Sequence, residues 1–123
     1  MIRAFDASGR SNVGHALETA VLLELERRGA EVGYVKTGSG LEVDFLARHP
    51  ASGEELIQVC ADLSNQDTQE RELRALTEAG GHHRNAVQRL LVLDRDAVAG
   101  LNSPQLEVQP VYEWMLETAP KKG

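Results

Sequence analysis

Three short apolar segments, separated only by turn residues, follow one another between residues 31 and 61. Residues 31–37 and 41–49 flank Gly38-Ser39-Gly40, whose glycines allow a β-hairpin to close, and residues 55–61 follow a second turn at 50–53. Apolar segments of this length between turns are typical of strands. The sequence therefore predicts three consecutive strands, of which the first two pair antiparallel.

The second of these strands carries a carboxylate near its middle. Successive side chains of a strand point to opposite faces, so Val43 and Phe45 are expected on one face and Asp44 and Leu46 on the other. A charge in the middle of a strand is costly unless it has a partner or a function. Asp44 is therefore a candidate functional residue.

Helices are expected before and after the three strands. Residues 11–29 repeat apolar side chains at helical spacing, between Ser11 as an N-cap and Gly29 as a C-terminal stop. Glu18 lies at the edge of this apolar stripe, where a carboxylate needs a partner. Residues 64–81 begin with a capping-box pattern and form the second expected helix.

The rest of the chain completes an α/β pattern. Residues 90–93 are an apolar run typical of a strand covered on both faces, and the strand–helix–strand order favours a parallel crossover. Residues 106–109 predict a further strand, and Pro110 opens a last helix. We therefore expect an α/β fold of order αβββαββα, in which helices flank a mixed central sheet.

The length of the chain is that of one compact domain. Its 123 residues, 41% of them hydrophobic, are enough for one core. We expect a single domain over residues 1–123, with an ordered core at about 11–118 and a frayed tail at 119–123. The single cysteine excludes a disulfide framework within the chain, and the sequence shows neither a signal peptide nor a membrane span. A cytoplasmic location is therefore expected.

The net charge of −6 opposes contact with a phosphate backbone. A local basic patch could offset it, made of five scattered cations: Arg27, Arg28, Lys36, Arg84 and Arg89. Cations spread in this way are more often a solvated surface. DNA therefore remains a partner to test, although the net charge and the scattered cations give it little support.

The order of the elements and three motifs resemble the core of the PD-(D/E)XK nucleases. The motifs are Gly14-x-x-x-Glu18 in the first helix, Thr37 to Phe45 across the hairpin, and Leu56 to Cys60 in the third strand. They look like one branch of that superfamily, the nuclease-like domain of unknown function found C-terminal to the ATPase module in many bacterial and archaeal AAA-type ATPases. The likeness extends from Gly14 to about Leu116.

The resemblance implies a set of vestigial motif positions. In active members, the motif aspartate and the Glu-x-Lys of the next strand converge on one or two divalent metals, with a helix glutamate nearby. Asp44 and Glu18 match two of these roles, whereas Gln58 stands at the glutamate position and Cys60 at the lysine position. An amide oxygen can ligate Mg²⁺ or Mn²⁺ but supplies no charge, and loss of the lysine costs on the order of 10²- to 10³-fold in rate.

Other interpretations of these positions stay open. Lys36 on the neighbouring strand could replace the missing lysine. Asp44 and Glu18 could instead be structural carboxylates, bound by arginine, threonine or backbone donors. Cys60 in an apolar strand is more simply a structural cysteine than a nucleophile, since no positioned histidine base is evident.

The leading hypothesis is a degenerate nuclease-like module that acts by binding, with an AAA-type ATPase module in cis or in trans as its partner. The chain has no G-x-x-x-x-G-K-[ST] motif and so cannot hydrolyse ATP as a P-loop enzyme. Neither a membrane partner nor a small-molecule substrate is expected. One alternative is a Mg²⁺- or Mn²⁺-dependent DNA endonuclease with Glu18, Asp44 and Gln58 as metal ligands. The other is a structural oligomerisation domain with an apolar patch at Trp114, Met115 and Leu116.

Overall fold

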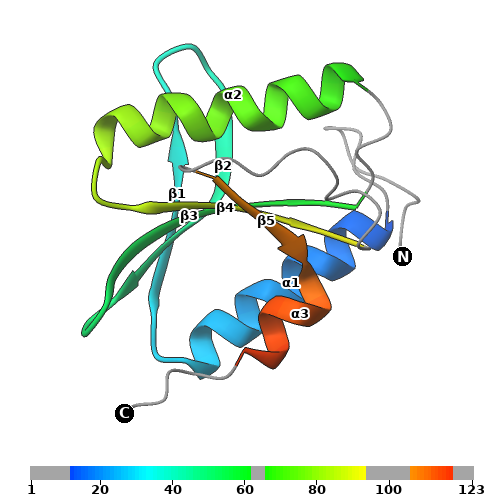
Figure 1. The fold of residues 1–123 in the computed structure, drawn as a ribbon, viewed down its shortest axis with the longest axis vertical. Coiled ribbons are helices and arrows are strands. Elements are labelled where there is room, and N and C mark those ends of the chain that lie inside the picture. Colours follow the sequence, from blue (N-terminus) through cyan, green and yellow to red (C-terminus); the bar gives the residue numbers. More distant parts are fainter. Residues whose placement is uncertain (1–11, 62–65, 94–105, 118–123) are drawn as a thin grey trace.

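The computed structural model describes residues 12–61, 66–93 and 106–117. These residues form eight elements in the order expected from the sequence, αβββαββα (Figure 1). Their bounds are α1 (Asn12–Arg27), β1 (Glu31–Lys36), β2 (Glu42–His49), β3 (Gly53–Cys60), α2 (Gln66–His82), β4 (Val87–Val92), β5 (Leu106–Pro110) and α3 (Val111–Leu116). The caps expected at Ser11 and Ser64 and the tail at 119–123 lie outside the described residues.

The five strands form one mixed sheet in the order β1-β2-β3-β4-β5. The first three strands pair antiparallel, because only short turns connect them. The long connection through α2 lets β4 run parallel to β3, and β5 in turn pairs parallel to β4. The expected α/β fold with a mixed sheet is therefore confirmed.

The helices cover both faces of the sheet, with α2 on one face and α1 and α3 on the other (Figure 1). Strand β3 supplies side chains to both cores by simple alternation. Leu56 and Cys60 pack in the α2 core, whereas Ile57 and Val59 pack with α1 and α3. Trp114 is 1% exposed within the second core, so it cannot contribute to the surface patch expected for an oligomerisation domain.

Strand β2 departs from the expected alternation. Two β1–β2 pairs bound the irregularity, namely Gly33 with Leu46 and Val35 with Val43. Between them β1 has one residue, Tyr34, and β2 has two, Asp44 and Phe45, so β2 contains a bulge. Val43 and Leu46 consequently both pack in the α2 core, whereas Phe45 packs on the α1 side. The prediction that Val43 and Phe45 share a face was wrong, because alternation fails across an extra residue.

Helix α1 ends at Arg27, and Gly29 stops it as the sequence predicts. The Ala30 N–H donates to the Leu25 oxygen and the Gly29 N–H to the Glu26 oxygen, both at 3.0 Å, and Gly29 has a φ of 85°. This is the Schellman arrangement, in which glycine adopts the left-handed conformation at low cost.

In the described part of the chain, no helix is long and apolar enough to cross a membrane.

Candidate functional site

Gln58 lies on β3 and joins three parts of the fold. Its side chain is 2% exposed. The Oε1 atom accepts a hydrogen bond from the Asp44 N–H at 2.8 Å, and Nε2 donates to the Glu42 oxygen at 3.1 Å. A longer contact of 3.5 Å joins Nε2 to the Glu72 oxygen of α2. Gln58 therefore ties β3 both to β2 and to the helix that covers them.

Asp44 makes the converse contact. Its Oδ2 atom accepts a hydrogen bond from the Val59 N–H at 2.9 Å. The regular β2–β3 pairing ends at Phe45 with Ile57, one residue short of Asp44. The side chains of Asp44 and Gln58 thus each bind the backbone of the opposite strand where the ladder stops. Asp44 has the backbone donor that the structural interpretation of this carboxylate requires.

Cys60 ends β3 inside the α2 core. It is 8% exposed and belongs to the apolar cluster that includes Leu56, Leu76 and Val92. A thiol is tolerated in such surroundings, whereas a lysine ammonium there would lose its hydration. Cysteine therefore suits the packing of this position better than a lysine would.

Glu18 and Lys36 lie apart from Gln58 and Cys60. Glu18 belongs to α1, on the sheet face opposite the α2 core toward which Gln58 and Cys60 point. Lys36 is exposed at the end of β1 and pairs with Glu42 of β2, so β2 separates it from β3. Among the five residues singled out in the sequence, a hydrogen bond joins Asp44 and Gln58.

Asp44 and Gln58 each use a side-chain oxygen to hold β2 against β3. The oxygen of Gln58 already accepts the Asp44 N–H, and Oδ2 of Asp44 already accepts the Val59 N–H. Within residues 12–61, 66–93 and 106–117, no group of three or more His, Cys, Asp or Glu side chains is placed to hold a metal ion. Mg²⁺ requires several hard oxygen ligands in near-ideal octahedral geometry.

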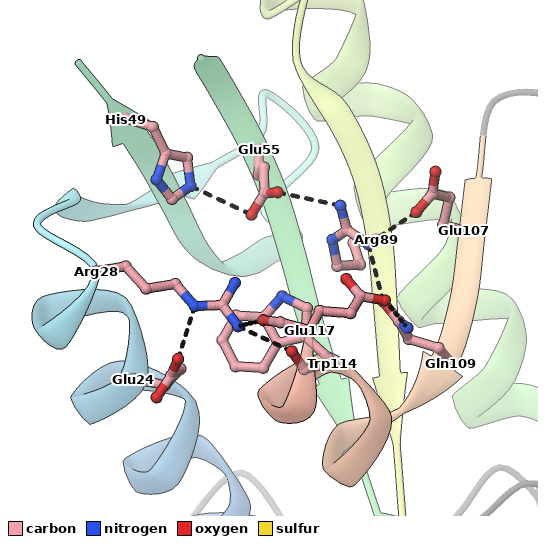
Figure 2. A network of polar contacts seen from close by, with 9 residues as sticks. All are labelled: Glu24, Arg28, His49, Glu55, Arg89, Glu107, Gln109, Trp114 and Glu117. Carbon is pink, nitrogen blue, oxygen red and sulfur yellow. Dashed lines mark hydrogen bonds and ion pairs between the residues drawn. The ribbon is translucent and has the colours of Figure 1, made fainter. Parts of the chain in front are cut away.

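A second polar cluster, which the sequence did not reveal, crosses the α1 face of the sheet (Figure 2). Its centre is Arg89 of β4, which is 9% exposed. Arg89 donates to Glu55 on β3 at 3.1 Å, and on β5 to Glu107 at 2.8 Å and to Gln109 at 2.9 Å. On β2, His49 Nε2 lies 3.4 Å from Glu55 Oε1. The only sequence signal is a charged or polar residue at matching places on four strands, and their register appears only in the folded sheet.

A third cluster ties α1 to α3 and also appears in Figure 2. Glu24, 8% exposed, accepts hydrogen bonds from Arg27 and Arg28 at 2.7 to 3.0 Å. These bonds, that from Arg27 first, lower the pKa of Glu24 from 4.5 to about 2, against the opposing effect of burial. Arg28 also donates to the backbone oxygens of Trp114 and Glu117.

These two clusters bear on the basic patch considered from the sequence. Arg27 and Arg28 both form ion pairs with Glu24, and Arg89 forms ion pairs with Glu55 and Glu107. Three of the five cations in that patch are therefore held by carboxylates. A phosphate backbone would have to compete with those carboxylates for each arginine.

Comparison with known proteins provides one relative. The chain is 43% identical over 79 residues to an uncharacterised protein, MJ1544, from the archaeon Methanocaldococcus jannaschii. The match covers 61% of this chain but 17% of the archaeal protein, so this chain spans less than a fifth of that relative. No protein-family model matches the chain, and no solved structure matches it.

Proposed function

We propose that this chain is a degenerate PD-(D/E)XK nuclease-like module that acts by binding rather than by cleavage. The observation that carries the proposal is the reciprocal bonding of Asp44 and Gln58. Each side chain binds the backbone of the other strand at 2.8 to 2.9 Å, where the β2–β3 ladder ends. Side chains committed to holding two strands together are poorly placed to bind a metal and activate water.

The surroundings of the motif lysine position support the same proposal. A cation at this position would help to orient the attacking group and stabilise the transition state. Cys60 is instead buried among apolar side chains. Lys36, the substitute considered from the sequence, is exposed and lies two strands away from β3 across β2. A cleavage reaction would therefore lack the cation that orients the attacking group and stabilises the transition state.

The partner we propose is a protein, an AAA-type ATPase module in cis or in trans. The net charge of −6 and the carboxylate-bound arginines disfavour nucleic acid. Most of the archaeal relative lies outside the matched stretch, as expected if a module of this kind is carried within a longer protein. The chain would then function together with that ATPase module.

The first experiment incubates the protein with labelled single-stranded, duplex and branched DNA in Mn²⁺. We expect no cleavage and at most weak, salt-sensitive binding. The control is Asp44→Asn, which keeps a side-chain oxygen for the Val59 N–H and so preserves the β2–β3 contact. Cleavage that disappears in Asp44→Asn, with folding intact, would favour the Mn²⁺-dependent endonuclease and overturn the proposal.

A second experiment tests the protein partner. The chain is titrated into the AAA-type ATPase encoded in the same or an adjacent reading frame, and heat of binding and ATP hydrolysis are recorded together. We expect saturable binding with a Kd in roughly the micromolar range and a changed rate of hydrolysis. Absence of binding, together with tight binding to one of the DNA substrates, would replace the protein partner by nucleic acid.

A further inference from the structure

The outer edge of β1 has no neighbour among the described strands. Strand β1 is one of the two end strands of the sheet, and Glu31, Gly33, Tyr34 and Lys36 are all exposed. Tyr34 is 68% exposed, a large fraction for an aromatic side chain. An uncovered edge presents unpaired N–H and C=O groups that can template another strand. This edge is therefore a candidate interaction surface.

The hairpin contact establishes which backbone groups point outward. The Thr37 N–H donates to the Leu41 oxygen at 2.7 Å, so the backbone of Thr37 faces β2. Backbone groups of an extended strand alternate in direction. The N–H and C=O groups of Val32, Tyr34 and Lys36 consequently point away from β2. The extra residue of the bulge belongs to β2, so this outer edge is continuous.

We propose that β1 pairs antiparallel with β1 of a second copy of this chain, with Tyr34 on the two-fold axis. A two-fold axis relating antiparallel neighbours stands perpendicular to the sheet, so residues that face each other must lie on the same face. Only registers that pair even with even and odd with odd positions satisfy this condition. With Tyr34 on the axis, Tyr34 faces Tyr34 and Val32 faces Lys36 of the second copy.

The Tyr34-centred register gives more of the outward backbone groups a partner than the register centred on Gly33. The Tyr34-centred register pairs all the outward groups of Val32, Tyr34 and Lys36 with one another. Centring on Gly33 would carry Lys36 past the partner strand, opposite Ala30 in the turn after α1. In the Tyr34-centred register no like charges face each other, and the two exposed tyrosines form a cross-strand aromatic pair.

The second copy is favoured over other occupants because the Tyr34-centred register pairs every outward backbone group of β1 with a group of its own copy. A single added strand buries less than a standard interface, so the dimer should be weak, with a Kd in roughly the micromolar to millimolar range. The competing surface is the outer side of α3, where Tyr112, Met115 and Leu116 are exposed. That helix serves as the control surface.

Sedimentation of the full chain over a concentration series tests association. We expect the mass to rise from 13.4 kDa toward twice that value by about 1 mM. Tyr34→Lys places two ammonium groups against each other at the axis and should weaken the dimer at least about tenfold, whereas Tyr34→Phe should preserve it. Tyr112→Lys, the same change on α3, should have no effect. A monomer throughout, or a dimer broken by Tyr112→Lys and not by Tyr34→Lys, would refute the proposal.

Disulfide trapping tests the register. Tyr34→Cys faces itself across the axis, within the Cα separation that a disulfide spans. Lys36→Cys is displaced from its own copy by four residues, or about 13 Å along the strand, and should not cross-link. The native Cys60 is buried. Mild oxidation should therefore yield a covalent dimer with Tyr34→Cys and not with Lys36→Cys, and equal cross-linking of both variants would exclude this register.

Discussion

The guanidinium of Arg28 lies 4.5 Å above the centre of the Trp114 ring and donates to the Trp114 backbone oxygen at 2.8 Å. The same guanidinium binds Glu24 on one side and the Glu117 oxygen on the other (Figure 2). Helix α3 spans only Val111–Leu116, too short to be stable on its own. One arginine at the end of α1 therefore binds one carbonyl oxygen of α3 and that of the residue after the helix, and it stacks on the buried Trp114.

Arg28→Lys should destabilise the fold although it keeps the charge. A lysine ammonium is a point charge without the planar fork that binds two carbonyl oxygens and stacks on an indole. We expect a loss of about 1–2 kcal/mol in the free energy of unfolding, measured by urea titration with the fluorescence of the single tryptophan as the probe. Arg27→Lys is the matched control, because Arg27 is 62% exposed. Equal losses for the two variants would contradict the role given to Arg28.

Glu24 should make stability depend on acid pH. Its pKa is about 2 in the folded chain, against an ordinary value of 4.5. Because the folded pKa is depressed, the ionised carboxylate stabilises the fold fully above pH 4.5, and this stabilisation is lost as pH falls through about 2. Glu24→Gln should lower stability at neutral pH by about 1–2 kcal/mol and flatten its decline below pH 4.5. Glu26→Gln, an exposed change on the same helix, should leave the unfolding curves at each pH unchanged.

Gln58→Met should disconnect β2 from β3 at Asp44. Methionine has similar volume, but it leaves the Asp44 N–H and the Glu42 oxygen without their partner. We expect a loss of about 1–3 kcal/mol and faster hydrogen exchange at the Asp44 amide. Gln66→Met, on the exposed start of α2, provides the control and should stay within about 0.5 kcal/mol of the parent. Unchanged exchange at Asp44 would show that the contact does not hold the strands.

Arg89→Met should expose the dependence of the sheet on its polar cluster. The change leaves Glu55, which is 17% exposed, without its cationic partner. Uncompensated carboxylates in such surroundings are costly, and we expect a loss of about 2–4 kcal/mol. Arg84→Met, in an exposed turn, is the control. A double variant, Arg89→Met with Glu55→Leu, should recover part of the loss, and failure to recover any would argue against the pairing.

The element order followed from local signals that act over a few residues. Gly29 ended α1 because only a residue at ease in the left-handed conformation closes a Schellman turn. The Gly38-Ser39-Gly40 turn allowed the hairpin, in which Gly40 has a φ of 88°. Strand β4 begins at Val87 rather than at residue 90, because its first residues are defined by pairing with β3 and β5 and not by their own hydrophobicity.

The candidate site was less accessible from the sequence. The residue types of Asp44 and Gln58 marked them as unusual, yet their contact lies at a bulge of β2 that alternation does not predict. Glu18 falls on the other face of the sheet from the α2 core that Gln58 and Cys60 face. Spacing within one element predicts which side chains share its face, but which faces meet depends on packing between elements.

The sequence alone thus determined the α/β class, the order of helices and strands and the mixed sheet, since turns, caps and periodicity are properties of neighbouring residues. Only the tertiary structure decided the partners of Asp44 and Arg89 and the contact of Arg28 with α3. The contact between Arg89 and Glu55 spans 34 positions, and that between Arg28 and Trp114 spans 86. Contacts at such separations arise from strand register and helix docking, which the burial of apolar surface over the whole chain establishes cooperatively.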